Sequence, residues 1–173
     1  MIGVLMMVTS AMAVGSTPDT TAAPVSVIYF DLGNTLVKRV SEGPRRVWIS
    51  GAPQVLTRLH EAGFVLGVLS NTGPFTWNDV LSNILPADFD PALFDPRLIV
   101  VSSAVGAEKP DPRIFQFAIT QTDLPAGEIL FVTETMEHVL AAQASGMRAL
   151  WIGEGDLSQM ADDLIAMRPT TGE

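Results

Sequence analysis

The sequence predicts one α/β domain with a doubly wound parallel sheet. Short apolar segments rich in β-branched and aromatic residues alternate with amphipathic segments of helical length. Consecutive parallel strands need such crossover helices, which then cover both faces of the sheet. With 173 residues, of which 47% are hydrophobic, the chain is long enough for one well-developed core and short for two.

The first strand is expected over residues 25–30, where a run of mostly β-branched and aromatic residues leads into Asp31 and Gly33. In open α/β sheets, ligands bind at the carboxyl ends of the strands, so Asp31 lies at the edge where a site is expected. Four further strands are expected over residues 64–69, 98–101, 129–132 and 149–152.

A helix is expected over residues 53–62, because Pro53 suits a first helical turn and Gly63 suits a stop. The segment 33–50 is turn-rich and predicts a hairpin with its tip at residues 41–44. Further helices are expected over residues 76–85, 113–121 and 157–167, and an alanine-rich helix should end near Ser145.

Residues 1–24 differ in composition from the domain predicted over 25–168 and from the short tail 169–173. They form an apolar leader and a small, polar linker, and Ala11-Met12-Ala13 has the form of a signal-peptidase site. No Lys or Arg precedes the short apolar run, so a mis-assigned start or a disordered tail is an equal alternative. We therefore expect a cytoplasmic protein, with export as the alternative if residues 1–13 are cleaved.

Composition excludes several classes of function. A net charge of −9 and a pI near 4.5 argue against a nucleic-acid-binding scaffold, which needs a basic face. The chain has no cysteine, which removes disulfides, thiolate catalysis and cysteine zinc sites. After the leader, no apolar run approaches the ~20 residues of a membrane span.

Polar residues follow the predicted strands where the chemistry of a site would lie. They are Asp31, then Ser70 with Asn71, and Glu134 with Glu137 or His138; Lys109 precedes a helix between the third and fourth strands. An Asp at the end of a buried strand can serve as a nucleophile, a metal ligand or both. Alone it could equally cap a turn.

In this order and spacing, the residues resemble the haloacid dehalogenase-like (HAD) hydrolase superfamily over about residues 25–155. The similar motifs are FDLGNTL (30–36), VLSNTG (68–73), EKPDPRIF (108–115), and ILFVTE with AAQASGM (129–134 and 141–147). The resemblance implies a Rossmann-like, HAD-type core. It also implies a magnesium-dependent phosphatase, because most members have that activity.

The resemblance assigns a role to each matching residue. Asp31 would attack phosphorus and form an aspartyl-phosphate, while Ser70 and the Asn71 amide would bind phosphate oxygens. Lys109 would contact both Asp31 and the phosphate. Mg²⁺ would be held by Asp31, the Gly33 carbonyl and Glu134. These parts match what phosphoryl transfer requires: a nucleophile, neutralised oxygens and a metal that screens like charges.

Two departures weaken the match. Gly33 stands where the phosphatases usually carry a second Asp as general acid and base, and Glu134 stands where an Asp is usual. The further acidic partner falls at Glu137 or His138, which the sequence leaves open, so weak metal binding is expected. A catalytically weak or silent phosphoryl-binding or regulatory domain is therefore the alternative function, followed by a purely structural interaction protein.

The sequence leaves no room for a cap domain, since about 20 residues separate Gly33 from the first helix and about 25 separate Ser70 from the third strand. An open site is expected, with a phosphorylated small molecule or macromolecule as the substrate. Four positive charges in the predicted hairpin, Lys38, Arg39, Arg45 and Arg46, either guide that anion or simply flank a turn. The oligomeric state stays open.

Overall fold

The computed structural model describes residues 24–41, 43, 45–153 and 157–166. Nearly all of the predicted leader (1–24) and the whole tail (169–173) lie outside these residues. Their boundaries, and the choice between a cytoplasmic and an exported protein, therefore stay predictions.

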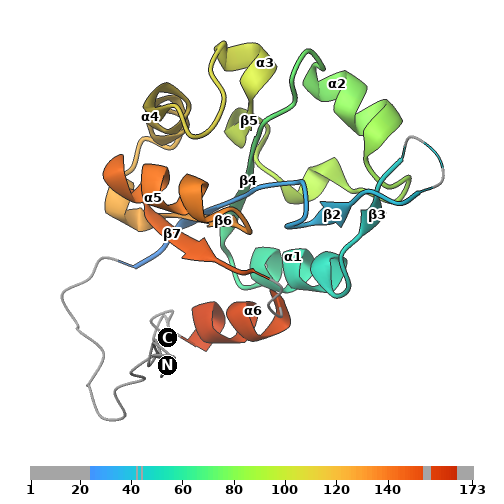
Figure 1. Ribbon diagram of the computed structural model, residues 1–173. Coiled ribbons are helices and arrows are strands. Elements are labelled where there is room, and N and C mark those ends of the chain that lie inside the picture. Colours follow the sequence, from blue (N-terminus) through green and yellow to red (C-terminus); the bar gives the residue numbers. More distant parts are fainter. Residues whose placement is uncertain (1–23, 42, 44, 154–156, 167–173) are drawn as a thin grey trace, which may run out of the picture.

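Five parallel strands form the central sheet in the order β5-β4-β1-β6-β7 (Figure 1). The chain leaves β1 to one side through β4 and β5 and returns to the other side through β6 and β7, which confirms the predicted doubly wound fold. The strands are β1 (Val27–Phe30), β4 (Val65–Ser70), β5 (Ile99–Val101), β6 (Ile129–Thr133) and β7 (Arg148–Trp151).

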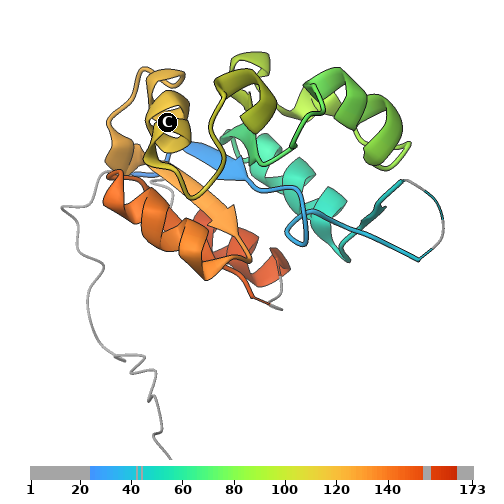
Figure 2. The same ribbon diagram turned by 45° about the horizontal axis from the view of Figure 1, so that its top comes forward.

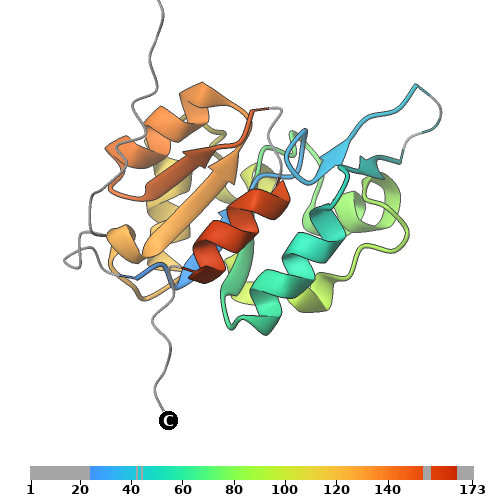
Figure 3. The same cartoon turned by 90° about the horizontal axis from the view of Figure 1, so that it is seen from below.

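The strand β1 is fully buried because helices cover both of its faces. Its side chains alternate: Ile28 and Phe30 join one apolar cluster, and Val27 and Tyr29 join the other. The first cluster includes residues of α1 (Ala52–Glu61) and α6 (Leu157–Ala166), which lie side by side in Figure 3. The second lies under α4 (Pro112–Thr120) and α5 (Met136–Ala144).

The segment after β4 differs from the single helix expected over residues 76–85. A capping box between Thr76 and Asp79 starts α2 (Trp77–Asp79), but the chain then widens into the π-helical turn η1 (Val80–Ile84). The Leu85 N–H bonds the carbonyl of Val80 at 2.9 Å, a five-residue step. Short elements not predicted are α3 (Ser102–Val105), η2 (Pro91–Leu93), η3 (Pro96–Leu98) and η4 (Ala126–Glu128).

The predicted hairpin is present as β2 (Val37–Lys38) and β3 (Val47–Trp48), which pair antiparallel. Trp48 stacks on Phe89 at 5.4 Å between ring centroids, and Phe89 stacks on Phe94 at the same distance. The Trp48 indole also donates a hydrogen bond to Asp88 at 2.9 Å. These contacts hold the hairpin against the loop that follows η1.

The described residues contain no cap domain, as predicted. Only the hairpin separates β1 from α1, and only short helical turns separate β4 from β5. Figure 2 shows the hairpin and the α2–η1 segment together on one side of the molecule. Within the part of the chain that the structure describes, no helix has the length and apolar character to cross a membrane.

Candidate functional site

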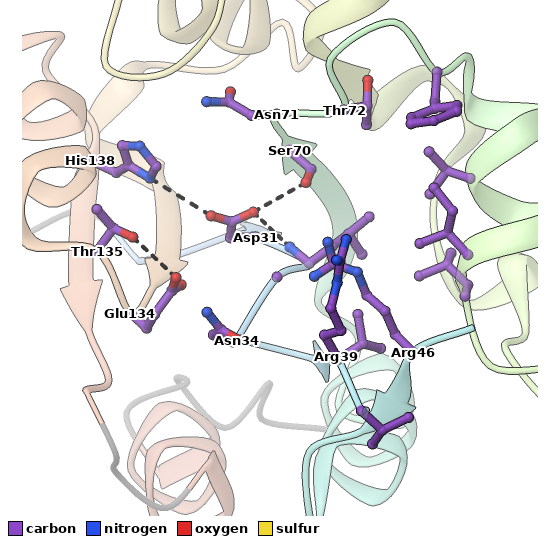
Figure 4. Close-up of a pocket in the computed structure, with 18 of the residues that line it drawn as sticks. Asp31, Asn34, Arg39, Arg46, Ser70, Asn71, Thr72, Glu134, Thr135 and His138 are labelled. Atoms are coloured by element: carbon purple, nitrogen blue, oxygen red, sulfur yellow. Dashed lines mark hydrogen bonds and ion pairs between the residues drawn. The ribbon is translucent and has the colours of Figure 1, made fainter. Parts of the chain in front are cut away.

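A cavity of about 760 Å³ opens at the carboxyl edge of the sheet (Figure 4). Residues that follow β1, β4 and β6 form one part of its wall, including Asp31, Ser70 and Glu134. The hairpin and the α2–η1 segment form the rest, including Arg46 and Val80. This volume suits a small molecule.

Asp31 lies in this cavity because β1 is the central strand. Its neighbours β4 and β6 end on either side of it and supply Ser70 and Thr133. The Asp31 Oδ1 atom accepts hydrogen bonds from the Leu32 N–H at 2.8 Å and the Ser70 hydroxyl at 3.2 Å. Thr133 donates to Oδ2 at 3.3 Å. The carboxylate is therefore held in one orientation from both sides.

Lys109 forms an ion pair with Asp31, with 2.6 Å between Nζ and Oδ2. Its side chain is 0% exposed, and its ammonium also donates to the Leu69 carbonyl at 2.7 Å. Burial alone would raise the pKa of Asp31, but the Lys109 ammonium, the neighbouring His138 and the Leu32 N–H outweigh it and lower that pKa to about 2. Asp31 is therefore ionised at neutral pH, as a carboxylate nucleophile must be.

Burial of Lys109 differs from the expectation that it also touches the phosphate. The side chain lies behind Asp31 and is not among the residues that line the cavity. Asn71 does line the cavity, and its side chain bonds the backbone of Lys109 twice, donating to the carbonyl at 2.9 Å and accepting from the N–H at 2.8 Å. Lys109 therefore supports Asp31 from behind the cavity wall, whereas Asn71 is part of that wall and its role toward phosphate stays a prediction.

Glu134 lines the cavity with its carboxylate surrounded by hydroxyl groups. Thr35 donates to Oε2 at 2.7 Å. Thr135 donates to Oε1 at 3.1 Å, a contact drawn in Figure 4. A longer contact of 3.4 Å joins the Thr133 hydroxyl to Oε2. Thr35 carries a fully buried hydroxyl four residues after Asp31 and is not among the site residues expected from the sequence.

His138, not Glu137, faces the site. The two residues lie in the first turn of α5, and only His138 lines the cavity. Its Nδ1 atom lies 3.8 Å from Asp31 Oδ2, within ion-pair range if His138 is protonated, but it has no hydrogen-bond partner among the described residues (Figure 4). The helical phase of α5 decides between neighbours that the sequence could not separate.

The oxygen donors beside Asp31 fit Mg²⁺ in kind. Asp31, Glu134 and Gly33 line one cavity and offer two carboxylates and a carbonyl. Mg²⁺ prefers oxygen ligands and needs only one or two carboxylates, because it keeps several waters. Among the described residues, no group of three or more acidic, histidine or cysteine side chains is placed to hold a metal ion. Within the described residues, the site therefore offers few side chains that could bind a metal ion.

The four hairpin cations take different positions. Arg39 and Arg46 line the cavity, whereas Lys38 and Arg45 do not. Arg45 donates instead to the carbonyls of Ser82 and Leu85, which fixes the hairpin to the η1 segment. The sequence showed the local excess of charge, but only the strand geometry assigns two cations to the site.

Arg46 occupies the space beside Gly33. A Cβ atom added to Gly33 would lie 3.1 Å from Arg46 Nη1. The place where a residue-33 side chain would project is therefore next to a guanidinium.

A profile of the haloacid dehalogenase-like hydrolases matches residues 34–152, more than half of the chain. The chain belongs to this family. Among solved structures, a HAD-like hydrolase of Porphyromonas gingivalis superimposes with a TM-score of 0.64 at 16% identity, covering 85% of this chain and all of the other. A HAD-superfamily hydrolase of Ehrlichia chaffeensis gives 0.63 at 13% identity, covering 83% of this chain and 98% of the other. At these identities, the superpositions show the fold.

Two relatives that the chain matches in sequence are named as phosphatases of small molecules. A glyceraldehyde 3-phosphate phosphatase of Pyrococcus abyssi is 28% identical over 109 residues, which are 62% of this chain and 43% of the relative. A phosphoglycolate phosphatase of Pseudomonas fluorescens is 27% identical over 112 residues, 61% of this chain and 36% of the relative. The chain thus spans less than half the length of these relatives.

Proposed function

We propose that this protein hydrolyses the phosphate monoester of a small molecule through an aspartyl-phosphate at Asp31. The observation that carries the proposal is the ionised, oriented Asp31 carboxylate in a cavity of small-molecule size, paired with Lys109 at 2.6 Å. The family membership and the phosphatase activity of the relatives support it.

In the first step, Asp31 Oδ1 attacks phosphorus, because Oδ2 is held by the buried Lys109 ammonium. The Oδ1–P bond forms as the ester P–O bond breaks, and the leaving group takes the electron pair. The Ser70 hydroxyl, 3.2 Å from Oδ1, can turn to a phosphoryl oxygen as the substrate enters. Lys109 acts as a positioning residue that keeps Asp31 ionised.

In the second step, a water oxygen attacks phosphorus and the P–O bond to Asp31 Oδ1 breaks, which regenerates the Asp31 carboxylate. The proton that the water loses passes to solvent, because Gly33 has no side chain to accept it, and phosphate is released. Gly33 supplies no proton to the leaving group in the first step, so the alcohol oxygen departs as an anion and takes its proton from water. Esters with stable leaving anions should therefore react fastest.

We propose that Mg²⁺ is the cofactor, held by Asp31, the Gly33 carbonyl and Glu134. When bound, it would screen the carboxylate nucleophile from the anionic phosphate. Since the site offers two carboxylates, we expect weak binding that millimolar Mg²⁺ is needed to saturate.

A second candidate function is a silent phosphoryl-binding domain. The observation that favours it is the absence of a side chain at residue 33 together with the nitrogen atom of His138 beside Asp31. The same residues would then hold a phosphorylated ligand without turnover.

One assay separates the two candidates. Purified protein is incubated with 4-nitrophenyl phosphate and with an alkyl phosphate, each with Mg²⁺ and with EDTA. The phosphatase proposal expects Mg²⁺-dependent turnover that is much faster for the aryl ester. Absence of turnover for both esters, with phosphate still bound in calorimetry, would favour the silent domain.

A further inference from the structure

Among the residues that the structure describes, Arg39 and Arg46 are cations without an acidic partner. Three other arginines, Arg58, Arg97 and Arg113, each form an ion pair with an aspartate. Within the described part of the chain, neither Arg39 nor Arg46 forms an ion pair. Arg45 also lacks a recorded ion pair, but its guanidinium is bonded to two backbone carbonyls. Arg39 and Arg46 thus present charge in a chain with 19 acidic and 10 basic residues, where acidic partners are abundant.

Both side chains line the cavity that contains Asp31. Figure 4 shows them entering from the hairpin on one side of Asp31, with Glu134 and His138 on the other side. Arg46 is half-buried, and Arg39 is exposed at the rim. A guanidinium offers several N–H donors in one plane, which match the oxygens of a carboxylate or phosphate.

The hairpin is held firmly enough to place these groups. The Arg46 N–H bonds the Ile84 carbonyl at 2.7 Å, and Arg45 bonds two further carbonyls of the same segment. Trp48 of β3 also stacks on Phe89, in the loop that follows η1. Arg39 and Arg46 therefore lie directly beside a strand pair that is fixed to the body of the domain.

The phosphoryl group itself does not account for both arginines. If it binds at Asp31, its nearest cation is Lys109, whose charge is already paired with Asp31 at 2.6 Å. Arg46 lies beside Gly33, where the rest of the substrate would extend. Arg39 and Arg46 each lie one residue beyond the last pair of the ladder, Lys38 with Val47, and Arg39 is the more exposed of the two.

We propose that Arg39 and Arg46 form a second anion subsite, so that the preferred substrate is a small phosphate monoester with a further carboxylate or phosphate group. The inference rests on the proposed function for the identity of the first group. The subsite itself is a binding property and can be measured without turnover.

Binding is tested with phosphonates, whose C–P bond is not hydrolysed. Calorimetry on the full chain compares 3-phosphonopropionate, which carries a carboxylate, with propylphosphonate, which does not. The wild-type protein should bind the carboxylate-bearing ligand about 10- to 100-fold more tightly, the range for hydrogen bonds to charged groups. Arg46→Gln and Arg39→Gln should each remove most of that preference.

Lys38→Gln is the matched control, because Lys38 neighbours Arg39 in the hairpin but does not line the cavity. It removes the same unit of charge and should leave the ligand preference within about 2-fold, as expected for an exposed charge that contacts no ligand. Thermal unfolding checks that all three variants are folded. Equal affinity of the wild-type protein for the two phosphonates would overturn the subsite. Equal loss in Lys38→Gln would overturn it too, because general charge would then explain the preference.

Kinetics distinguishes the subsite from the catalytic proposal. For 4-carboxyphenyl phosphate, Arg46→Gln should lower kcat/KM about 10- to 100-fold, with a far smaller loss for 4-methylphenyl phosphate. Equal losses for both esters would place Arg46 on the phosphoryl group and overturn its role in a second subsite. If calorimetry shows the preference for the carboxylate-bearing ligand but no ester is hydrolysed, the second subsite is supported and the proposed phosphatase activity is rejected.

Discussion

Asp31 and Arg46 line the same cavity, yet their charges are satisfied in different ways. Asp31 has a cation at 2.6 Å and hydrogen bonds to both oxygens, supplied by Leu32 next to it and by residues at or beyond the ends of β4 and β6. Arg46 has its backbone fixed and no ion pair among the described residues. The sheet edge is therefore preorganised without a ligand, whereas the hairpin presents charge that a ligand would neutralise.

If the proposed function and subsite hold, the difference teaches how the described domain, which contains no cap, would select a substrate. The sheet would place the reacting group, and it is rigid because each strand is hydrogen-bonded to its neighbours. The hairpin, which is fixed to a second short insertion, would place the selecting groups. Four changes test this division, in decreasing order of expected effect.

Asp31→Asn should lower hydrolysis by at least roughly 10⁴-fold, because an amide cannot attack phosphorus. It should also destabilise the fold by about 3–5 kcal/mol, since Lys109 becomes an unpaired buried charge. Because Asp and Asn have nearly the same volume, the sequence alone predicts that Asp31→Asn leaves the fold intact. The buried Lys109 ammonium, which loses its counter-charge, predicts a loss of stability instead. The measurements are phosphate release and urea unfolding.

A double variant separates the two effects. Asp31→Asn with Lys109→Met removes both charges and should recover most of the lost stability while staying inactive. Asp162→Asn is the control, because its partner Arg58 is exposed, and it should cost less than about 1 kcal/mol. Undiminished hydrolysis in Asp31→Asn would reject Asp31 as the nucleophile.

Gly33→Asp should restore a proton donor only when Arg46 is also changed. The new side chain would project to within ion-pair distance of Arg46, which would keep the carboxylate ionised. With Arg46→Gln added, turnover of alkyl phosphates should rise by up to about 10² to 10⁴, with a much smaller gain for aryl phosphates.

The comparison of single and double variants is the measurement, using steady-state kinetics on one alkyl and one aryl ester. If Gly33→Asp alone gives the full gain on alkyl esters, Arg46 does not control the charge at residue 33.

Stability should fall in acid as Asp31 takes up a proton. Its pKa is about 2 in the folded protein, against 3.8 as the ordinary value, so the folded state prefers the ionised form. The contribution, about 2 kcal/mol, is fully present above pH 3.8 and is lost as the pH falls through 2. Urea unfolding in EDTA should show this loss for the wild-type protein. The charge-free double variant should show a shallower slope, and identical slopes would contradict the assignment.

Lys38→Gln should have the smallest effect, because this cation can act only at a distance. At low salt, it should lower kcat/KM for an anionic ester by less than about 3-fold, and at ~0.5 M salt the difference should vanish as the Debye length shortens. Loss in Arg46→Gln should persist at high salt, since a desolvated contact is screened less. If both variants showed the same salt dependence, Lys38 and Arg46 could not be assigned different roles, one as a long-range attraction and the other as a direct contact.

The sequence alone determined the strand order in the chain, the hairpin and the polar residues at the strand ends. Short apolar runs predict buried strands, and Asp31 and Ser70 follow two of these runs directly. Local sequence patterns were therefore enough to predict the strands and the polar residues at their ends. The helix over residues 76–85 was only partly predicted, because a π-helical turn depends on how Val80 and Leu85 pack against the hairpin and the core.

Tertiary structure alone decided how charges pair. Lys109 lies 78 residues from Asp31 in sequence, and only the parallel pairing of β1 with β4 and β6 brings the surrounding strand ends together around that pair. The phase of α5 decided that His138 and not Glu137 faces the site, and the register of a two-residue ladder decided that Arg46 and not Arg45 lines the cavity. The sequence shows which residues are charged. The electrostatic energy of a pair depends on the distance between the two charges and on their burial, which only the folded chain defines.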